Sequence, residues 1–263
     1  MSGASTQVRP PAVAGTFYPA DPTVLAATVD DFLAGAASTD PAPGRSRPKA
    51  LIAPHAGYVY SGPVAATAYR RRLADGDPVQ RVVVFGPAHR FPVTSMALSG
   101  AEAWSTPLGT VPIDVETTGR LLDAGRRLGV VVDDRAHATE HSLEVHVPFL
   151  QRVLPEGFSL LPVAVGAART EDVADALELV WGGPETLVVV STDLSHYHPY
   201  AEAAALDRAT AARIVARQVD LRPERACGAY PVRGLLEVAR RNHLDVELVD
   251  LRSSGDTAGS RYQ

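Results

Sequence analysis

Five short apolar runs recur along the chain, and each of them predicts a buried strand. They are rich in β-branched residues, and apolar positions mostly follow one another instead of alternating with polar ones. Such runs are typical of strands that are covered on both faces of a sheet. The runs are KALIAP (49–54), RVVVFG (81–86), SLLPVAV (159–165), TLVVVS (186–191) and DVELVDL (245–251).

Amphipathic patterns with helical spacing lie between these runs. They cover residues 62–74, 115–129, 170–182, 200–219 and 232–243. In the third pattern Thr170 is the expected N-cap, because acidic residues follow it in the first turn. Alternating strands and helices predict an α/β fold with three layers: a mostly parallel or mixed central sheet with helices on both faces. We expect one domain over residues 1–263, with surface loops at 38–49 and 71–80.

Composition narrows the class of protein. Hydrophobic residues make up 46% of the chain and charged residues 21%, as in an ordinary globular protein. The formal net charge of −5 argues against a nucleic-acid-binding face. We expect no membrane span, because no run of 18 apolar residues occurs, and no secretory signal; a cytoplasmic location is the resulting expectation. The single cysteine, Cys227, excludes an internal disulfide and a CxxC zinc site.

Polar side chains with metal-binding chemistry follow three of the predicted strands. His55 follows the first, His89 follows the second, and Asp193 and His196 follow the fourth, with His198 close behind. Ligands of open α/β sheets bind beyond the carboxyl ends of strands, so the imidazoles converge if these strands are neighbours. Any one of them alone is more simply an ordinary loop histidine. Together they favour a metal site, because histidine is the commonest transition-metal ligand.

A fourth cluster lies in ATEHSLEVHVPFLQRVL (138–154). Its titratable members are Glu140, His141, Glu144 and His146. His141 and Glu144 are three positions apart and would share a helix face, but the pattern is not a standard zinc motif. Two interpretations stay open: a helix start with Thr139 or Ser142 as N-cap, or His141 and Glu144 lining the crevice behind the ligands.

Cys227 and several aromatic residues complete the candidate site. Cys227 lies between two helical patterns next to Gly228, a place that favours a cavity over the core. A thiolate there would be a soft ligand, suited to copper(I), zinc or iron. Phe17 could wall the pocket and Tyr58 could point into it, whereas Tyr18 is more simply a packing residue.

Six segments together resemble the Memo family, called AmmeMemoRadiSam system protein B in prokaryotes. They are RPPAVAGTFYP, LIAPHAGYVYSGPVAATAY, VVVFGPAHR, EHSLEVHVPFLQ, STDLSHY and CGAYPV. The resemblance implies a fold like that of class III extradiol dioxygenases, which hold non-haem iron(II) with two histidines and a glutamate. By this resemblance His55 and His89 match the histidine ligands, and Cys227 stands where the Memo family replaces the glutamate by cysteine. His196, with Asp193 beside it, matches the acid/base histidine, while His198 has no assigned counterpart.

The resemblance implies a metal-binding protein with a His/His/Cys site at the carboxyl edge of the sheet. We expect iron or copper there, and redox chemistry on a small molecule; the thiolate argues against ring cleavage itself. The alternative is a non-catalytic peptide- or metal-binding module in a pathway linked to a radical S-adenosylmethionine protein, with that protein and an Amme-type protein as partners. A metal-free hydrolase that uses Cys227 as nucleophile and His196 as base is a third hypothesis. We also expect a final strand to be missing or shortened near the C-terminus, with a partner over the sheet edge.

Overall fold

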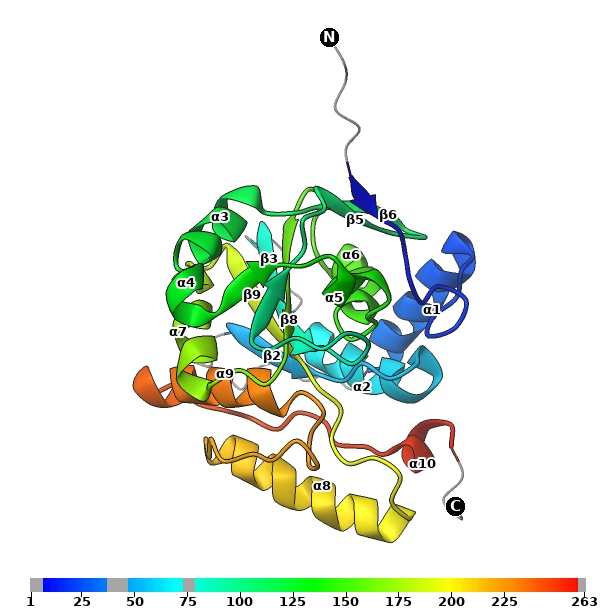
Figure 1. Cartoon of the computed structure of the whole chain (residues 1–263). Coiled ribbons are helices and arrows are strands. Elements are labelled where there is room, and N and C mark those ends of the chain that lie inside the picture. Colours follow the sequence, from blue (N-terminus) through cyan, green and yellow to red (C-terminus); the bar gives the residue numbers. More distant parts are fainter. Residues whose placement is uncertain (1–6, 37–46, 73–78, 260–263) are drawn as a thin grey trace.

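The computed structural model describes residues 7–36, 47–72 and 79–259, and a six-stranded sheet forms its centre (Figure 1). The strand order is β2-β9-β3-β8-β4-β7. The four strands from β2 to β8 are parallel, and β4 runs antiparallel to β8 but parallel to β7. Their bounds are β2 Ala50–Ala53, β3 Arg81–Pro87, β4 Met96–Leu98, β7 Val130–Val132, β8 Ser159–Val165 and β9 Thr186–Ser191. The sheet is therefore mixed, with a parallel half that carries the predicted strands.

Helices cover both faces of this sheet, and the side-chain alternation of β3 shows why its sequence is apolar throughout. Val82 and Val84 pack toward α1, α2 and α6, whereas Val83 and Phe85 pack toward α3, α7 and α9. All four side chains are fully buried, and burial of each contributes about 1.5–3 kcal/mol. The helices of the first face are α1 Pro22–Gly35, α2 Tyr58–Arg72 and α6 Val147–Val153. Those of the second are α3 Val115–Asp123, α4 Gly125–Leu128, α7 Thr170–Val180 and α9 Ala229–Arg241.

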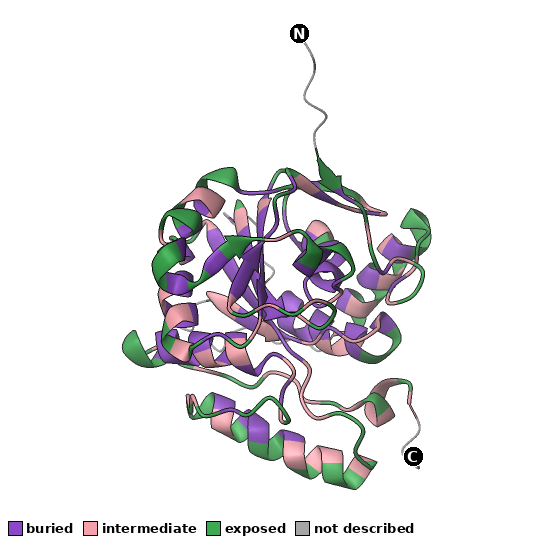
Figure 2. Cartoon of the chain, in the orientation of Figure 1, coloured by how far each residue is buried: buried purple, intermediate pink, exposed green. Residues whose placement is uncertain are grey.

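The remaining elements lie at the margins of the three layers. A second, three-stranded sheet of order β1-β5-β6 contains the first strand of the chain. Its strands are β1 Val8–Arg9, β5 Ala103–Thr106 and β6 Gly109–Pro112. The short helices are α5 Arg135–Ala138, the 3-10 turn η1 Glu144–His146 and α10 Ser254–Thr257. Helix α8 Tyr200–Val215 lies at the outer side of β2. Figure 2 shows the central strands of the sheet buried, whereas the edge strand β7 is partly exposed and α8 is largely exposed or half-buried.

The predicted three-layer α/β fold is confirmed, with differences in single elements. Strands β8 and β9 have the predicted bounds, β2 is one residue shorter than predicted at each end, and β3 is one residue longer at its C-terminal end. The strand predicted at 245–251 is wrong, because no strand in the described part of the chain pairs with that segment. The helix predicted over 115–129 is divided at Ala124 into α3 and α4.

Two further expectations concern caps and loops. The N-cap of α7 is Arg169, without a side-chain cap bond, so Thr170 is the first helical residue instead of the cap. The loops expected at 38–49 and 71–80 fall mostly outside the described residues. None of the helices that the structure describes combines the length and the apolar character needed to span a bilayer.

Candidate metal centre

The order β2-β9-β3 makes neighbours of the three strands that precede the candidate residues. Their carboxyl ends therefore meet at one edge, where His55 follows β2 and His89 follows β3. The ligand atoms of His55, His89 and Cys227 all lie within 4.8 Å of one another. The structure thus brings together three side chains that the sequence separates widely.

Cys227 reaches this edge from the loop that precedes α9. Its backbone N–H donates to Asp193 O (3.1 Å), and its Sγ lies 3.3 Å from both Asp193 N and His55 Nε2. The next residue must be glycine: a Cβ on Gly228 would lie 2.3 Å from Ser191 O. This close approach of the α9 loop to the end of β9 holds the thiol beside the imidazoles.

A buried hydrogen-bond chain fixes the tautomer of His55. The Ser191 hydroxyl donates to Ser142 O (2.6 Å) and therefore accepts from His55 Nδ1–H at 2.6 Å. The same oxygen accepts from His146 Nε2–H (2.8 Å), so His146 Nδ1 accepts from the Tyr69 hydroxyl (2.9 Å). With its proton on Nδ1, His55 presents the lone pair of Nε2 to the centre. Burial lowers the pKa of His146 to about 3, which keeps this ring neutral.

The buried carboxylate of Glu140 fixes the orientation of the His89 ring, as Ser191 does for His55. Glu140 accepts from His89 Nδ1–H at 3.0 Å and from the backbone N–H groups of His89, Arg90, His141 and Ser142 at 2.5–3.2 Å. Burial would raise its pKa, but these donors outweigh burial and hold the pKa below the usual range. His89 Nε2 is consequently free to face Cys227. Carboxylate–histidine pairs of this kind orient metal-ligating imidazoles.

The thiol and the two imidazoles alter one another's protonation. Burial acts to raise the pKa of Cys227, but hydrogen bonds with His55 and His89 outweigh it and lower the pKa to about 6. Burial acts to lower the pKa of His89, but the Cys227 sulfur and the Glu140 carboxylate raise it to about 9. The pKa of His55 is also raised, because Asp193 and Cys227 outweigh its burial. Cys227 is therefore a thiolate at neutral pH.

His141 and Phe17 form a wall beside the centre. The His141 ring lies 4.8 Å from the His89 ring and 5.4 Å from the His55 ring, centroid to centroid. Phe17 packs against the His141 ring with a centroid-to-centroid distance of 4.5 Å. Burial lowers the pKa of His141 to about 4, so the ring is neutral at pH 7. His141, His89 and Glu140 also form a second group with metal-ligand spacing.

Asp193 lies between the centre and the more exposed His196. Its Oδ1 accepts from the His55 backbone N–H (2.8 Å), and its Oδ2 lies 3.9 Å from His55 Nε2 and 4.0 Å from His196 Nε2. The His196 side chain is 45% exposed. His198 pairs with Glu202 at 2.9 Å instead of joining the cluster.

The structure places two predicted pocket residues away from the centre. Glu144 is buried under the N-terminal segment, where it accepts from Arg9 (2.6 Å), from the Tyr18 hydroxyl (2.5 Å) and from two backbone N–H groups. Tyr58 is in the core and donates its hydroxyl hydrogen to Val145 O (2.7 Å). The shared helix face predicted for His141 and Glu144 is wrong, because helical structure begins only at Glu144.

The same segment corrects the predicted cap and shows what the sequence reasoning missed. Helix α6 has His146 at its N-cap, without a side-chain cap bond, so neither Thr139 nor Ser142 caps it. Glu140 and His146 were noted in the cluster, but neither was assigned to the site. The adjacent glutamate and histidine at 140–141 were the available signal; nothing in the sequence marks Ser191.

Comparisons with known proteins identify the family of the chain. A family model described as Memo-like protein matches residues 9–263. A MEMO1 family protein of Methanothermobacter thermautotrophicus is 35% identical over 271 residues, covering 97% of this chain and 96% of the relative. MEMO1 family proteins of Methanopyrus kandleri and Aquifex aeolicus are 36% and 35% identical, over 273 and 269 residues, and each match covers at least 95% of both chains. The chain therefore belongs to the Memo-like protein family.

Proposed function

We propose that the chain binds a redox-active metal, iron or copper, through His55, His89 and Cys227, and that it acts on a small molecule at this centre. The observation that carries the proposal is the convergence of the three ligand atoms within 4.8 Å of one another. Each imidazole is, in addition, held from behind by a buried partner that leaves its Nε2 free. An ordinary loop histidine that binds no ligand does not require a buried hydrogen-bond partner that fixes its tautomer and orientation.

The donor set fits this class of metal. Because the pKa of His89 is raised to about 9, a metal would have to displace its ring proton at neutral pH. Two imidazoles and one thiolate would then form a fairly soft ligand set, which suits copper or iron better than magnesium or calcium. The low pKa of Cys227, about 6, favours the thiolate that coordination requires. When bound, such a metal would supply electron transfer and Lewis acidity, and three protein ligands leave positions open for a small molecule.

The surrounding side chains would handle protons and exclude water. Asp193 Oδ2 lies 3.9 Å from His55 Nε2 and 4.0 Å from His196 Nε2, so a small movement would bring this carboxylate within hydrogen-bonding distance of His196. His196, half-exposed at the rim, would exchange protons with substrate on one side and solvent on the other. Phe17 and the neutral His141 would keep water from one flank of the centre.

One distance favours the alternative of a non-catalytic metal- or peptide-binding module. His196 Nε2 and Asp193 Oδ2 are 4.0 Å apart, which is longer than a hydrogen bond. The acid/base pair is thus not assembled, although the ligand cluster is. Metal binding without turnover would follow if no substrate draws these two groups together.

Elemental analysis of protein purified without added metal tests the proposal. We expect iron or copper in the wild type and its loss from His55→Ala, His89→Ala and Cys227→Ala. His198→Ala is the matched control, because His198 lies outside the cluster and pairs with Glu202. Equal metal content in His55→Ala and the wild type would refute the ligand assignment. Oxygen consumption by the loaded protein with catechol-like substrates then separates a redox enzyme from a binding module.

A further inference from the structure

Thr192 directly follows β9 and bonds the end of this strand to the loop that carries Cys227. Its Oγ1 accepts from the Gly228 N–H at 2.9 Å and donates to Asp193 O at 2.8 Å. Its backbone N–H donates to the carbonyl of Ala53 (3.0 Å), the last residue of β2. Thr192 is only 4% exposed, so its hydroxyl requires partners, and it has both a donor and an acceptor. Through Thr192 the ends of β2 and β9 are joined to the Cys227 loop.

Asp193 extends this connection to the sulfur itself. Asp193 O accepts from the Cys227 N–H at 3.1 Å as well as from the Thr192 hydroxyl, and Asp193 N–H donates to Cys227 Sγ at 3.3 Å. Thr192 Oγ1 lies 4.0 Å from Cys227 Sγ, so Thr192 acts on the sulfur mainly through these backbone groups. The position of the thiol therefore depends on how closely residues 192–193 and 227–228 approach each other.

The close approach at Gly228 explains why a hydroxyl is needed at position 192. A Cβ on Gly228 would lie 2.3 Å from Ser191 O and 2.7 Å from Thr192 Cβ, so the loop backbone lies directly against the end of β9. Gly228 is buried there, and a buried N–H requires an acceptor. Thr192 Oγ1 is that acceptor. A valine at this position would have nearly the same shape but could not accept the hydrogen bond.

We propose that Thr192 is a positioning residue of the metal centre, which holds the Cys227 sulfur 3.3 Å from His55 Nε2. The inference rests on the proposed function, because the role of Thr192 is to keep the sulfur within coordinating reach of the two imidazoles. Removing a group that orients a metal ligand typically lowers metal affinity about 10–100-fold. Hydrogen bonds to a ligating sulfur, such as the one from Asp193 N–H, also alter its electron donation to the metal.

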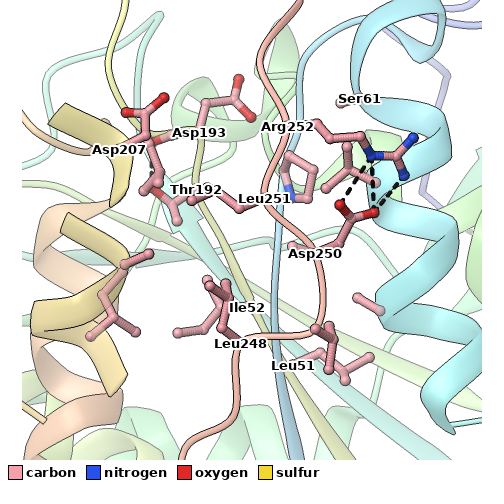
Figure 3. A pocket seen from close by; sticks show the side chains of 18 of the residues that line it. Leu51, Ile52, Ser61, Thr192, Asp193, Asp207, Leu248, Asp250, Leu251 and Arg252 are labelled. Carbon is pink, nitrogen blue, oxygen red and sulfur yellow. Dashed lines mark hydrogen bonds and ion pairs between the residues drawn. The ribbon is translucent and has the colours of Figure 1, made fainter. Parts of the chain in front are cut away.

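The surroundings of Thr192 give the same hydrogen bonds a second effect. Thr192 and Asp193 line a cleft of about 1900 Å³ beside β2 (Figure 3), whereas Cys227 is not part of its lining. Both residues approach the thiol, Thr192 with its hydroxyl and Asp193 with its backbone N–H. The hydrogen bonds to the Cys227 loop therefore keep residues 192–193 packed between the cleft and the sulfur.

A titration with Co²⁺, followed by absorption, tests the proposal. Co²⁺ is the probe because its thiolate charge-transfer band reports ligation by Cys227, and Cys227→Ala should lack this band. In Thr192→Val we expect the Co²⁺ affinity to fall about 10–100-fold and the band per bound ion to weaken. Thr192→Ser keeps the hydroxyl and should restore both. Thr210→Val is the matched control, because Thr210 is buried in α8 and its Oγ1 donates to Leu206 O.

A second measurement needs no metal and shows whether the hydroxyl holds the loop. In metal-free protein, amide hydrogen exchange followed by NMR should show the Gly228 N–H exchanging at least about fivefold faster in Thr192→Val than in the wild type. Thr210→Val should leave this exchange unchanged. Thr192→Ala should behave like Thr192→Val, and it serves if the valine variant folds poorly, because the smaller side chain leaves space around the Gly228 N–H.

The two measurements separate failure of this inference from failure of the proposed function. Wild-type Co²⁺ affinity and an unchanged thiolate band in Thr192→Val and Thr192→Ala would overturn the positioning role, and so would unchanged exchange of the Gly228 N–H. A loss of affinity that Thr192→Ser does not restore would also overturn it. A wild-type protein that binds no Co²⁺ would refute the metal centre, and this inference with it.

Discussion

Replacing Glu140 by glutamine should damage both stability and metal binding, although the two side chains have nearly the same shape. Glu140 is fully buried. Its Oε1 accepts from His89 Nδ1 and from the backbone N–H groups of His141 and Ser142, while Oε2 accepts from those of His89 and Arg90. An amide has one acceptor oxygen and one NH₂ donor group. Whichever way it turns, at least two N–H donors face an NH₂ group and lose their acceptor.

The size of the loss follows from these donors. A buried donor without a partner costs about 1–3 kcal/mol, so two of them cost about 2–6 kcal/mol. This is a large part of the roughly 5–15 kcal/mol by which a typical domain is stable. Because His89 also loses the carboxylate that orients it, metal affinity should fall about 10–100-fold.

Urea unfolding of the metal-free protein and a competition titration with a metal chelator measure the two effects separately. Glu202→Gln is the matched control: it is largely exposed, pairs with His198, and should change stability by less than about 0.5 kcal/mol. A Glu140→Gln protein within about 1 kcal/mol of the wild type, and with unchanged metal affinity, would refute the role assigned to this carboxylate.

Three further predictions address other contacts. Ser191→Ala removes the acceptor that fixes the His55 tautomer, so metal affinity should fall about 10–100-fold by chelator competition; unchanged affinity would contradict this role. In chelated protein, alkylation of Cys227 followed by mass spectrometry should show a midpoint near pH 6, slowing at lower pH as the thiolate is protonated; a midpoint near 9 would contradict the lowered pKa. Tyr18→Phe removes a hydrogen bond to buried Glu144 and should lower the free energy of unfolding by about 1–3 kcal/mol; no loss in urea titration would show that the contact is not stabilising.

The parallel half of the fold and the two proposed histidine ligands could be predicted from the sequence for one reason, whereas Cys227 was proposed from its loop position beside Gly228 and from the family resemblance. Strands buried on both faces have continuous apolar runs, so β3, β8 and β9 could be located within a residue or two. The carboxyl ends of such strands lie at one edge of the sheet, so His55 and His89 could be expected to meet there if their strands were near neighbours, as the order β2-β9-β3 makes them. The apolar pattern locates each strand, and the parallel arrangement of the strands places their carboxyl ends at one edge of the sheet.

Other features depend on contacts that no local pattern encodes. Glu140 belongs to the site because a loop brings it against His89, 51 positions away, whereas helical spacing pointed to Glu144. Ser191 looks like any strand-terminal serine until its three partners are in place. The segment 245–251 has the sequence of a strand, but a strand exists only where a neighbouring backbone pairs with it.

The proposed donors come from distant parts of the chain, and this has a consequence for how the centre assembles. Cys227 and His55 are 172 positions apart, and they meet only after β2, β9 and the α9 loop have docked. Chelation by all three proposed donors would therefore require the finished tertiary structure, because an unfolded chain could offer an ion only scattered single donors. Loss of bound ion during gradual denaturation should accordingly coincide with cooperative collapse of the whole sheet.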